Sequence, residues 1–194
     1  MKRCVPTIMI LAVAVGLLLP TTPAIADDQV SDWKALKREA KRAKIDEMAD
    51  QALKEVLDGS LKANTLFESA YGWAAFDNLK IAFGFSGGGG NGVAVIKETG
   101  DRTYMKMGTA GVGLGLGGQK YQVVFFFQDV STFTAFVEKG WTADATAQAA
   151  AGTEGANAAT GFVNGVAVWQ ITEKGLMASA DISGTKYWKN KDLN

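Results

Sequence analysis

The chain has 194 residues, with 20 basic and 20 acidic side chains, 23 glycines, one cysteine and no histidine. This length fits one domain with a hydrophobic core and is short for two. The balanced charge argues against a general nucleic-acid binder, and the lack of histidine removes the commonest general base and metal ligand. We therefore expect neither an enzyme nor a protein that holds a cofactor or a metal.

The first 26 residues have the three parts of a secretory signal peptide. Lys2 and Arg3 form a basic start, 7–19 is almost entirely apolar, and Ala24-Ile25-Ala26 offers a cleavage site between small residues. The apolar run is short for a membrane span. We expect this segment to be removed, which leaves an exported, periplasmic protein of residues 27–194 that contains no cysteine.

A long helix is expected to begin at Ser31 or Asp32 and to end near Leu57, with Asp58-Gly59 as its stop. Its two halves carry apolar stripes on roughly opposite sides. Because one straight helix cannot bury both stripes on one flat surface, either the helix breaks near Lys44 or its first half projects from the domain. The first stripe consists of Trp33, Leu36, Ala40 and Ala43, and the second of Ile45, Met48, Ala49, Ala52, Leu53 and Val56.

The first half of this helix is also basic. A basic amphipathic segment that carries a tryptophan suits an anionic lipid surface. The alternative is a charged face that only meets water, balanced by Glu39, Asp46 and Glu47. The candidate membrane-binding residues are Trp33, Lys34, Leu36, Lys37, Arg38, Lys41, Arg42 and Lys44.

The rest of the chain predicts one more short helix, then mainly strands. A capping box at Thr65 and Glu68 predicts a helix that ends near Tyr71. From residue 73 onward, short β-rich runs with tight turns favour an antiparallel sheet. We expect an α+β fold, in which a helical region (27–72) packs on a curved, barrel- or sandwich-like antiparallel sheet (73–194). Strands are expected at 80–85, 93–97, 102–107, 109–117, 119–127, 162–172 and 176–183, a turn at 99–101 and a short helix at 130–138, while propensity does not decide between strand and helix for 143–159.

Two glycine-rich stretches have different patterns. Residues 87–92 read as a mobile loop between strands. Residues 111–117 alternate glycine with apolar residues, so one face of this strand has no side chains. Such a face marks tight curvature, close packing or a bound ligand. A dinucleotide site is rejected, because the residues after Gly118 read as a strand rather than a helix. The candidate ligand-facing glycines are Gly111, Gly113, Gly115 and Gly117.

Aromatic residues predict two further features. Phe125-Phe126-Phe127 places phenylalanine on both faces of one strand, so one face meets a core and the other meets a helix, a partner or lipid. Tyr187-Trp188 is either an interfacial anchor or part of a final strand that packs onto the sheet.

Four segments together resemble the SYLF lipid-binding domain family, over roughly residues 45–194. They are Ala70-Tyr71-Gly72-Trp73-Ala74-Ala75-Phe76, the glycines of 87–92 followed by Val93-Ala94-Val95, the alternation of 111–117, and Glu173-Lys174-Gly175-Leu176-Met177-Ala178. The resemblance implies lipid binding, with membrane contact near the basic N-terminal helix. The family is also labelled an actin regulator, but the export signal makes anionic phospholipid the expected partner instead.

We therefore expect non-catalytic binding of phospholipid, at a membrane surface of the bacterial envelope or as a single molecule against the glycine face. The alternative is a structural or partner-binding envelope protein without a lipid ligand, in which the phenylalanine-rich strand and the glycine face meet another protein. A small outer-membrane barrel is a third interpretation, and the charged N-terminal helix counts against it.

Overall fold

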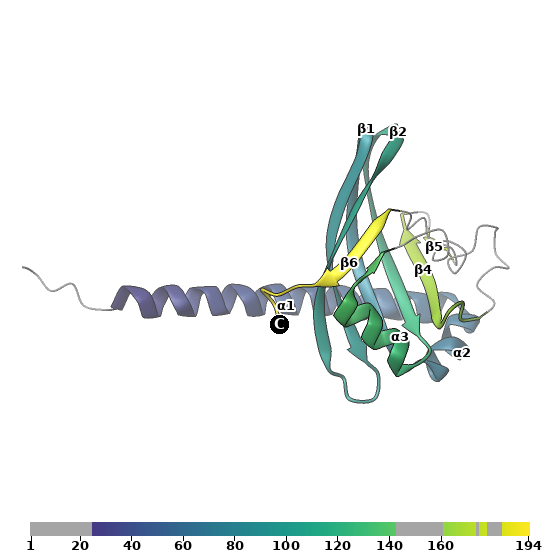
Figure 1. Cartoon of the computed structure of the whole chain (residues 1–194), viewed down its shortest axis with the longest axis horizontal. Coiled ribbons are helices and arrows are strands. Elements are labelled where there is room, and N and C mark those ends of the chain that lie inside the picture. Colours follow the sequence, from purple (N-terminus) through teal and green to yellow (C-terminus); the bar gives the residue numbers. More distant parts are fainter. Residues whose placement is uncertain (1–24, 143–160, 174, 178–183) are drawn as a thin grey trace, which may run out of the picture.

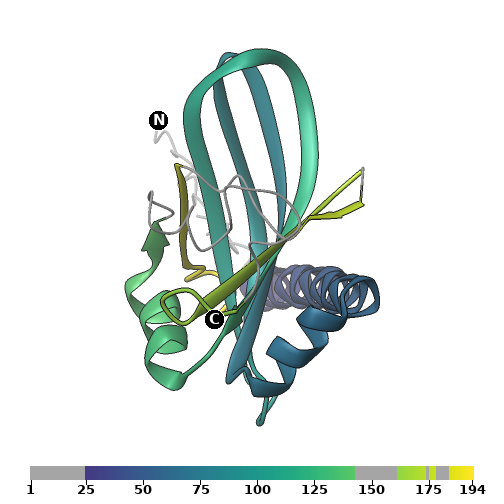
Figure 2. The same cartoon turned by 90° about the vertical axis from the view of Figure 1, so that its right-hand side faces the viewer.

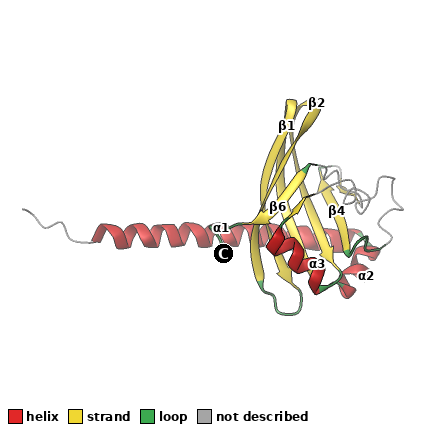
Figure 3. Cartoon of the chain, viewed as in Figure 1, coloured by secondary structure: helices red, strands yellow, loops and turns green. Residues whose placement is uncertain are grey.

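The computed structural model describes residues 25–142, 161–173, 175–177 and 184–194. Within them, a long N-terminal helix precedes a curled antiparallel sheet, and helices cover both faces of that sheet (Figures 1 and 3). The expected α+β class with a curved antiparallel sheet is confirmed.

Helix α1 is one uninterrupted helix, Ile25–Gly59, of 35 residues, so the expected start at Ser31 or Asp32 is wrong because both residues lie inside it. It does not break near Lys44, so the other alternative holds: its first half projects from the domain (Figure 1). Helix α2, Leu61–Ser69, begins at Ser60, whose side chain accepts a hydrogen bond from the backbone N–H of Ala63. The expected start at Thr65 is wrong, because Thr65 lies inside α2 and donates its hydroxyl to the Leu61 carbonyl.

Two long strands, β1 (Gly72–Ile96) and β2 (Arg102–Phe127), pair antiparallel over most of their length, on both sides of one register shift. The expected turn joins them, with Gly100 at a φ of +76°. Both strands bend back at their tips, so that β2 arches around β1 (Figure 2). The register shifts between Phe83 and Phe85, where β2 advances from residue 116 to residue 112. β2 lies on the outside of this bend and needs the extra residues for its longer path around the tip.

The expected loop at 87–92 is wrong, because these residues lie within β1 and pair with 105–110 of β2. Alternate glycines in this stretch allow the two halves of β1 to approach very closely. A Cβ on Gly90 would lie 1.6 Å from the Asp77 carbonyl oxygen, and one on Gly92 would lie 2.3 Å from that of Ala75. The glycines therefore serve close backbone packing inside a strand rather than freedom in a loop.

The remaining elements complete the sheet and cover its inner face. They are α3 (Val130–Thr134), the π-helical turn η1 (Ala135–Lys139), β3 (Trp141–Thr142), β4 (Val166–Thr172), β5 (Gly175–Met177) and β6 (Thr185–Lys189). The strands follow the order β3-β6-β2-β4-β5, with β1 paired to β2. The undecided segment 143–159 and most of the strand expected at 176–183 lie outside the described residues.

The inner face of the sheet holds an aromatic core. Phe125 of β2 and Tyr187 of β6 have ring centroids only 5.1 Å apart, although the bent halves of β1 and β2 lie between their strands. Four strand spacings would separate them by about 19 Å in a flat sheet, so the contact shows how strongly the sheet curls. Phe133 of α3 and Phe136 of η1 also pack in this core.

The outer face holds a second core under α1 and α2. Ile45, Ala49, Ala52 and Val56 of α1 pack there with Trp73, Phe126 and Trp169. Phe125 and Phe127 thus face the inner core and Phe126 the outer core, and all three are fully buried. The prediction was that one face of this strand meets a core and the other a helix, a partner or lipid, and its helical form is confirmed. Because all three phenylalanines are fully buried within the chain, the alternative that they meet another protein is wrong.

Candidate functional site

The arm of α1, defined here as residues 30–44, lies outside both cores. Every side chain in it is exposed except that of Arg42, which is half-buried. Trp33 and Leu36 are each 59% exposed and Val30 is 50% exposed. Single exposed apolar side chains are common on folded proteins, whereas several that lie together on one surface mark an interaction site. The arm therefore carries three exposed large apolar side chains within two turns of one helix, while Leu61, Leu79, Ile81, Val130 and Trp188 are exposed on other elements.

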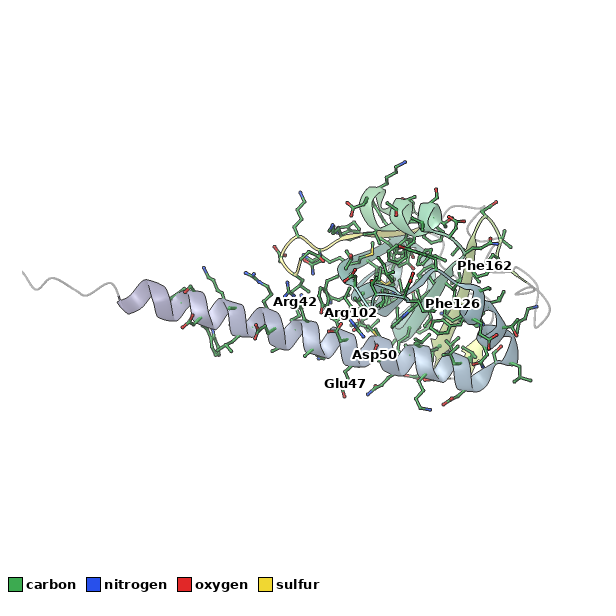
Figure 4. The ribbon with its side chains drawn as sticks, turned by 90° about the horizontal axis from the view of Figure 1, so that it is seen from below. Arg42, Glu47, Asp50, Arg102, Phe126 and Phe162 are labelled. Atoms are coloured by element: carbon green, nitrogen blue, oxygen red, sulfur yellow. The ribbon has the colours of Figure 1, made fainter. Side chains whose placement is uncertain are left out.

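The apolar stripe of the arm points away from the body of the protein. At about 100° per residue, it lies about 170° around the helix from the stripe that packs on the sheet. Glu47 continues the line of the arm stripe one heptad beyond Ala40, and Figure 4 shows Glu47 pointing away from the sheet. The stripe therefore faces outward, where none of the described elements covers it.

The arm carries six basic and two acidic residues, a net charge of +4. The charges are not spread evenly around the helix. Lys37 and Lys44 lie beside the apolar stripe on one flank, and the acidic residues Asp32 and Glu39 lie on the other flank. Lys37 also places its Nζ 4.9 Å from the centre of the Trp33 ring, a cation–π contact.

Arg42 differs from the other predicted basic residues, because the body of the protein already binds it. Its Nε donates to the Leu193 carbonyl oxygen at 2.7 Å, and its guanidinium lies 5.4 Å from the centre of the Tyr104 ring (Figure 4). Arg38 and Lys41 lie near Asp192, whose pKa is lowered first by its hydrogen bond with Lys106 and then by the charges of all three cations. These contacts turn part of the basic side toward the body.

A cluster of charges fixes the root of the arm to the sheet. Arg102 of β2 donates to Asp46 at 2.9 Å and to Asp50 at 3.0 Å (Figure 4). Burial alone would lower the pKa of Arg102, but the hydrogen bonds and charges of Asp50 and Asp46 outweigh it and raise that pKa. Tyr104 donates its hydroxyl to Asp46 at 2.9 Å, and burial followed by this carboxylate raises its pKa.

The C-terminus strengthens the same junction. The amide of Asn194 donates to the Tyr104 carbonyl at 2.8 Å and accepts from the Tyr104 N–H at 2.9 Å. Sequence reasoning missed the cluster of Arg102, Asp46 and Asp50, because residues more than 50 positions apart along the chain show no local pattern. The only signal was the end of the first stripe near Lys44, which marks where the body begins.

The predicted glycine site lies at the opposite end of the sheet from the arm's attachment. Gly111 pairs with Ser86, and Gly117 pairs with Ala82 at a φ of +138°. Residues 113–115 have no partner in β1, since they fall within the register shift. The structure therefore does not bring these glycines together with the arm. A ligand on this face stays a prediction, and the alternation coincides with the arch that β2 forms around the tip of β1 (Figure 2).

A groove of 390 Å³ on the sheet is a second place where a small molecule could lie. Its lining includes Asp77, Asn91, Lys120 and Gln122, together with Asn78. Asn78 is 3% exposed, and neither atom of its side-chain amide has a hydrogen-bond partner among the described residues. Sequence reasoning did not single out this asparagine, because one polar residue in a strand carries no motif.

Across the described ranges, no three His, Cys, Asp or Glu side chains converge to hold a metal ion. Tyr187 and Trp188 lie in β6, which pairs with β2, so the alternative of a final strand packed onto the sheet holds. The Tyr187 ring is fully buried and Trp188 is 38% exposed. None of the helices in the described part of the chain is both long and apolar enough to cross a membrane.

Comparison with known proteins finds similarity over parts of the chain. The model of the Ysc84 family, described as "Las17-binding protein actin regulator", matches residues 108–194. The chain is also 45% identical over 152 residues to Beta cell expansion factor A of Aeromonas veronii. That alignment covers 78% of this chain and 58% of the relative, so the chain spans less than two thirds of the relative's length. The arm lies outside the residues that the family model matches.

Proposed function

We propose that the protein is a non-catalytic phospholipid-binding protein of the bacterial envelope, and we start from the match of residues 108–194 to the Ysc84 (SYLF) family model. The observation that carries the proposal is the arm, where exposed Trp33 and Leu36 lie beside Lys37 on a helix that projects from the body. The proposal includes export to the periplasm, with the arm on an anionic membrane surface.

The charge of the arm supplies the long-range part of this binding. Each lysine or arginine near an anionic membrane surface contributes about 1 kcal/mol, which falls off within a Debye length. The lysines beside the apolar stripe contribute most, because they stay at the level of the headgroups when the stripe enters the membrane. Arg42 contributes least, since it is bound to Leu193 and lies against Tyr104.

The apolar stripe supplies the short-range part. Trp33 places an amphipathic ring at the membrane interface, where tryptophan is enriched, and Leu36 adds apolar area at about 25 cal/mol for each Å² removed from water. The family description names Las17 and actin. An exported protein does not meet a cytoplasmic actin network, so phospholipid is the partner that the proposal assigns to this chain.

Vesicle flotation tests this function. Vesicles of phosphatidylcholine with phosphatidylglycerol are expected to carry the protein upward, and vesicles of phosphatidylcholine alone to carry much less of it. Replacing Lys34, Lys37, Lys41 and Lys44 with Gln is expected to abolish flotation with the anionic vesicles. Unchanged flotation of this variant would refute the role of the arm.

A matched control removes the same charge from the body. Lys54, Lys62, Lys120 and Lys139 are all exposed, and their replacement with Gln changes the net charge by the same amount. This variant is expected to float as the unchanged protein does. Equal losses in the two variants would show that total charge, rather than the arm, controls binding.

A further inference from the structure

The apolar stripe of the arm has a stricter spacing than lipid contact requires. Trp33, Leu36, Ala40 and Ala43 follow each other at intervals of three, four and three residues. These are the a and d positions of a heptad repeat, the narrow seam along which two helices pair. A helix that lies in a membrane interface needs only a broad apolar face.

The charges beside the stripe match this seam. With Trp33 at position a, the acidic residues Asp32 and Glu39 take positions g, and the basic residues Lys37 and Lys44 take positions e. In a parallel pair of helices, each g residue faces the e residue five positions further along the partner helix. Asp32 then faces Lys37 of a second copy and Glu39 faces Lys44, and the two-fold symmetry doubles both pairs.

The same charges disfavour the antiparallel arrangement. Antiparallel helices bring g beside g and e beside e, so acidic residues would meet acidic residues and lysines would meet lysines. Like charges at such positions repel each other across the seam. The order of charges along the arm therefore selects the parallel orientation.

The position of the arm leaves room for a second copy. The stripe faces away from the sheet, and the half of α1 that carries it projects beyond the other elements (Figures 1 and 4). Two copies paired along this stripe would hold their bodies on opposite outer sides. The seam ends near Lys44, where Ile45 begins the stripe that α1 buries against its own sheet.

We propose that a second copy of this chain covers the stripe, in a parallel two-stranded coiled coil over residues 32–44. The dimer itself goes beyond the proposed function and does not depend on it. Only the competition between dimer and lipid rests on that function, because one stripe cannot face a partner helix and a membrane together. Two heptads with alanine at two seam positions make a weak interface, so the dimer forms and dissociates with protein concentration.

Charge reversal tests the pairing in sedimentation-velocity experiments over a range of concentrations. Asp32→Lys with Glu39→Lys makes both flanks basic, and Lys37→Glu with Lys44→Glu makes both flanks acidic. Each double variant alone is expected to lose the dimer, with a dissociation constant raised at least about tenfold. Mixing the two is expected to restore a dimer, because every facing pair is then opposite in charge. Dimers that persist in each variant alone, or a mixture that stays monomeric, would overturn the proposal.

A cysteine pair provides a second readout that does not depend on charge. In a Cys4→Ser background, Ala40→Cys places a thiol at a seam position that faces its own copy, whereas Arg38→Cys places one on the side of the helix opposite the seam. Oxidation is expected to cross-link the Ala40→Cys variant and to leave the Arg38→Cys variant monomeric. Cross-linking that is equal in the two variants would contradict the seam.

Flotation separates this proposal from the proposed function. The Asp32→Lys, Glu39→Lys variant is expected to float with anionic vesicles at least as well as the unchanged protein, because its arm is more basic. If the charge-reversal pattern holds and no form of the protein floats, the dimer stands and lipid binding fails. If the unchanged protein floats and sediments as a monomer at every concentration, the dimer fails and lipid binding stands.

Discussion

The two halves of α1 belong to one uninterrupted helix but have opposite relations to the rest of the protein. Residues 45–59 bury Ile45, Ala49, Ala52 and Val56 against the outer face of the sheet, and Asp46 and Asp50 bind Arg102. The arm, 30–44, buries none of its large apolar side chains. The comparison teaches that a helix of constant geometry can bury one apolar stripe in a core and leave a second apolar stripe exposed. The difference between the two halves depends only on the angular position of their apolar residues around the helix.

The largest expected difference between body and arm follows from removing an aromatic ring in each. Phe126 is fully buried, with ring centroids 4.4 Å from Trp169 and 5.2 Å from Phe67, so Phe126→Ala is expected to lower the free energy of unfolding by about 3–5 kcal/mol. Trp33→Ala in the arm is expected to change it by less than about 0.5 kcal/mol while weakening vesicle binding. Urea denaturation measures both values, and a Trp33→Ala variant that unfolds as easily as Phe126→Ala would place the arm inside the cooperative unit.

A smaller effect, confined to the body, comes from one methyl group. Gly90→Ala is expected to destabilise the protein by about 2 kcal/mol or more, because its Cβ would overlap the Asp77 carbonyl. Gly87 is the matched control in the same stretch, since nothing lies within 4 Å of the Cβ position there, and Gly87→Ala is expected to be neutral or slightly stabilising. Thermal unfolding of the two variants checks this. Equal effects would mean that the glycines matter only for backbone freedom.

The junction between the two halves should give an intermediate effect. Arg102→Gln removes the ion pairs with Asp46 and Asp50 and is expected to cost about 1 kcal/mol, since the side chains of Arg102 and Asp46 are about 70% buried. A double-mutant cycle with Asp46→Asn isolates the pair. A coupling energy near zero would show that packing alone holds the root of the arm.

The smallest expected effect appears at alkaline pH. Burial raises the pKa of Tyr187 well above its usual 10.0, and the pKa of Tyr104 is also raised. The folded protein keeps these phenols protonated while the unfolded chain releases their protons. The stabilisation is therefore complete below about pH 10 and is lost as the pH rises further.

Tyr187→Phe tests that sign. It is expected to weaken the alkaline decline in stability. At neutral pH it should cost little, because the Tyr187 hydroxyl has no hydrogen-bond partner among the described residues. Chemical denaturation at pH 7 and pH 10.5 measures the change. An identical pH dependence in this variant would exclude Tyr187 as its source.

The sequence predicted the features that depend on local periodicity. The two stripes of α1, the turn at Gly100 and the helix that buries Phe133 and Phe136 were all readable from residue spacing. The alternation around Phe126 likewise predicted a strand covered on both faces. These predictions hold because helical and strand periods repeat within a few residues.

The sequence did not predict features that depend on distant contacts. The glycines of 87–92 have the composition of a loop. They form a strand because they pair with β2 and pack closely against the first half of β1, which are contacts between distant residues. Thr65 and Glu68 match a capping box, but Ser60 begins the helix earlier. The pairing of Arg102 with Asp46 joins residues 56 positions apart and leaves no local pattern.

Amide hydrogen exchange along α1, with and without anionic vesicles, tests the central claim most directly. Without vesicles, residues 45–56 are expected to exchange slowly and residues 30–41 quickly, because only the first group packs on the sheet. Adding phosphatidylglycerol vesicles is expected to slow exchange in residues 30–44 and to leave the sheet unchanged. Vesicle-induced protection in the sheet with none in the arm would contradict the account.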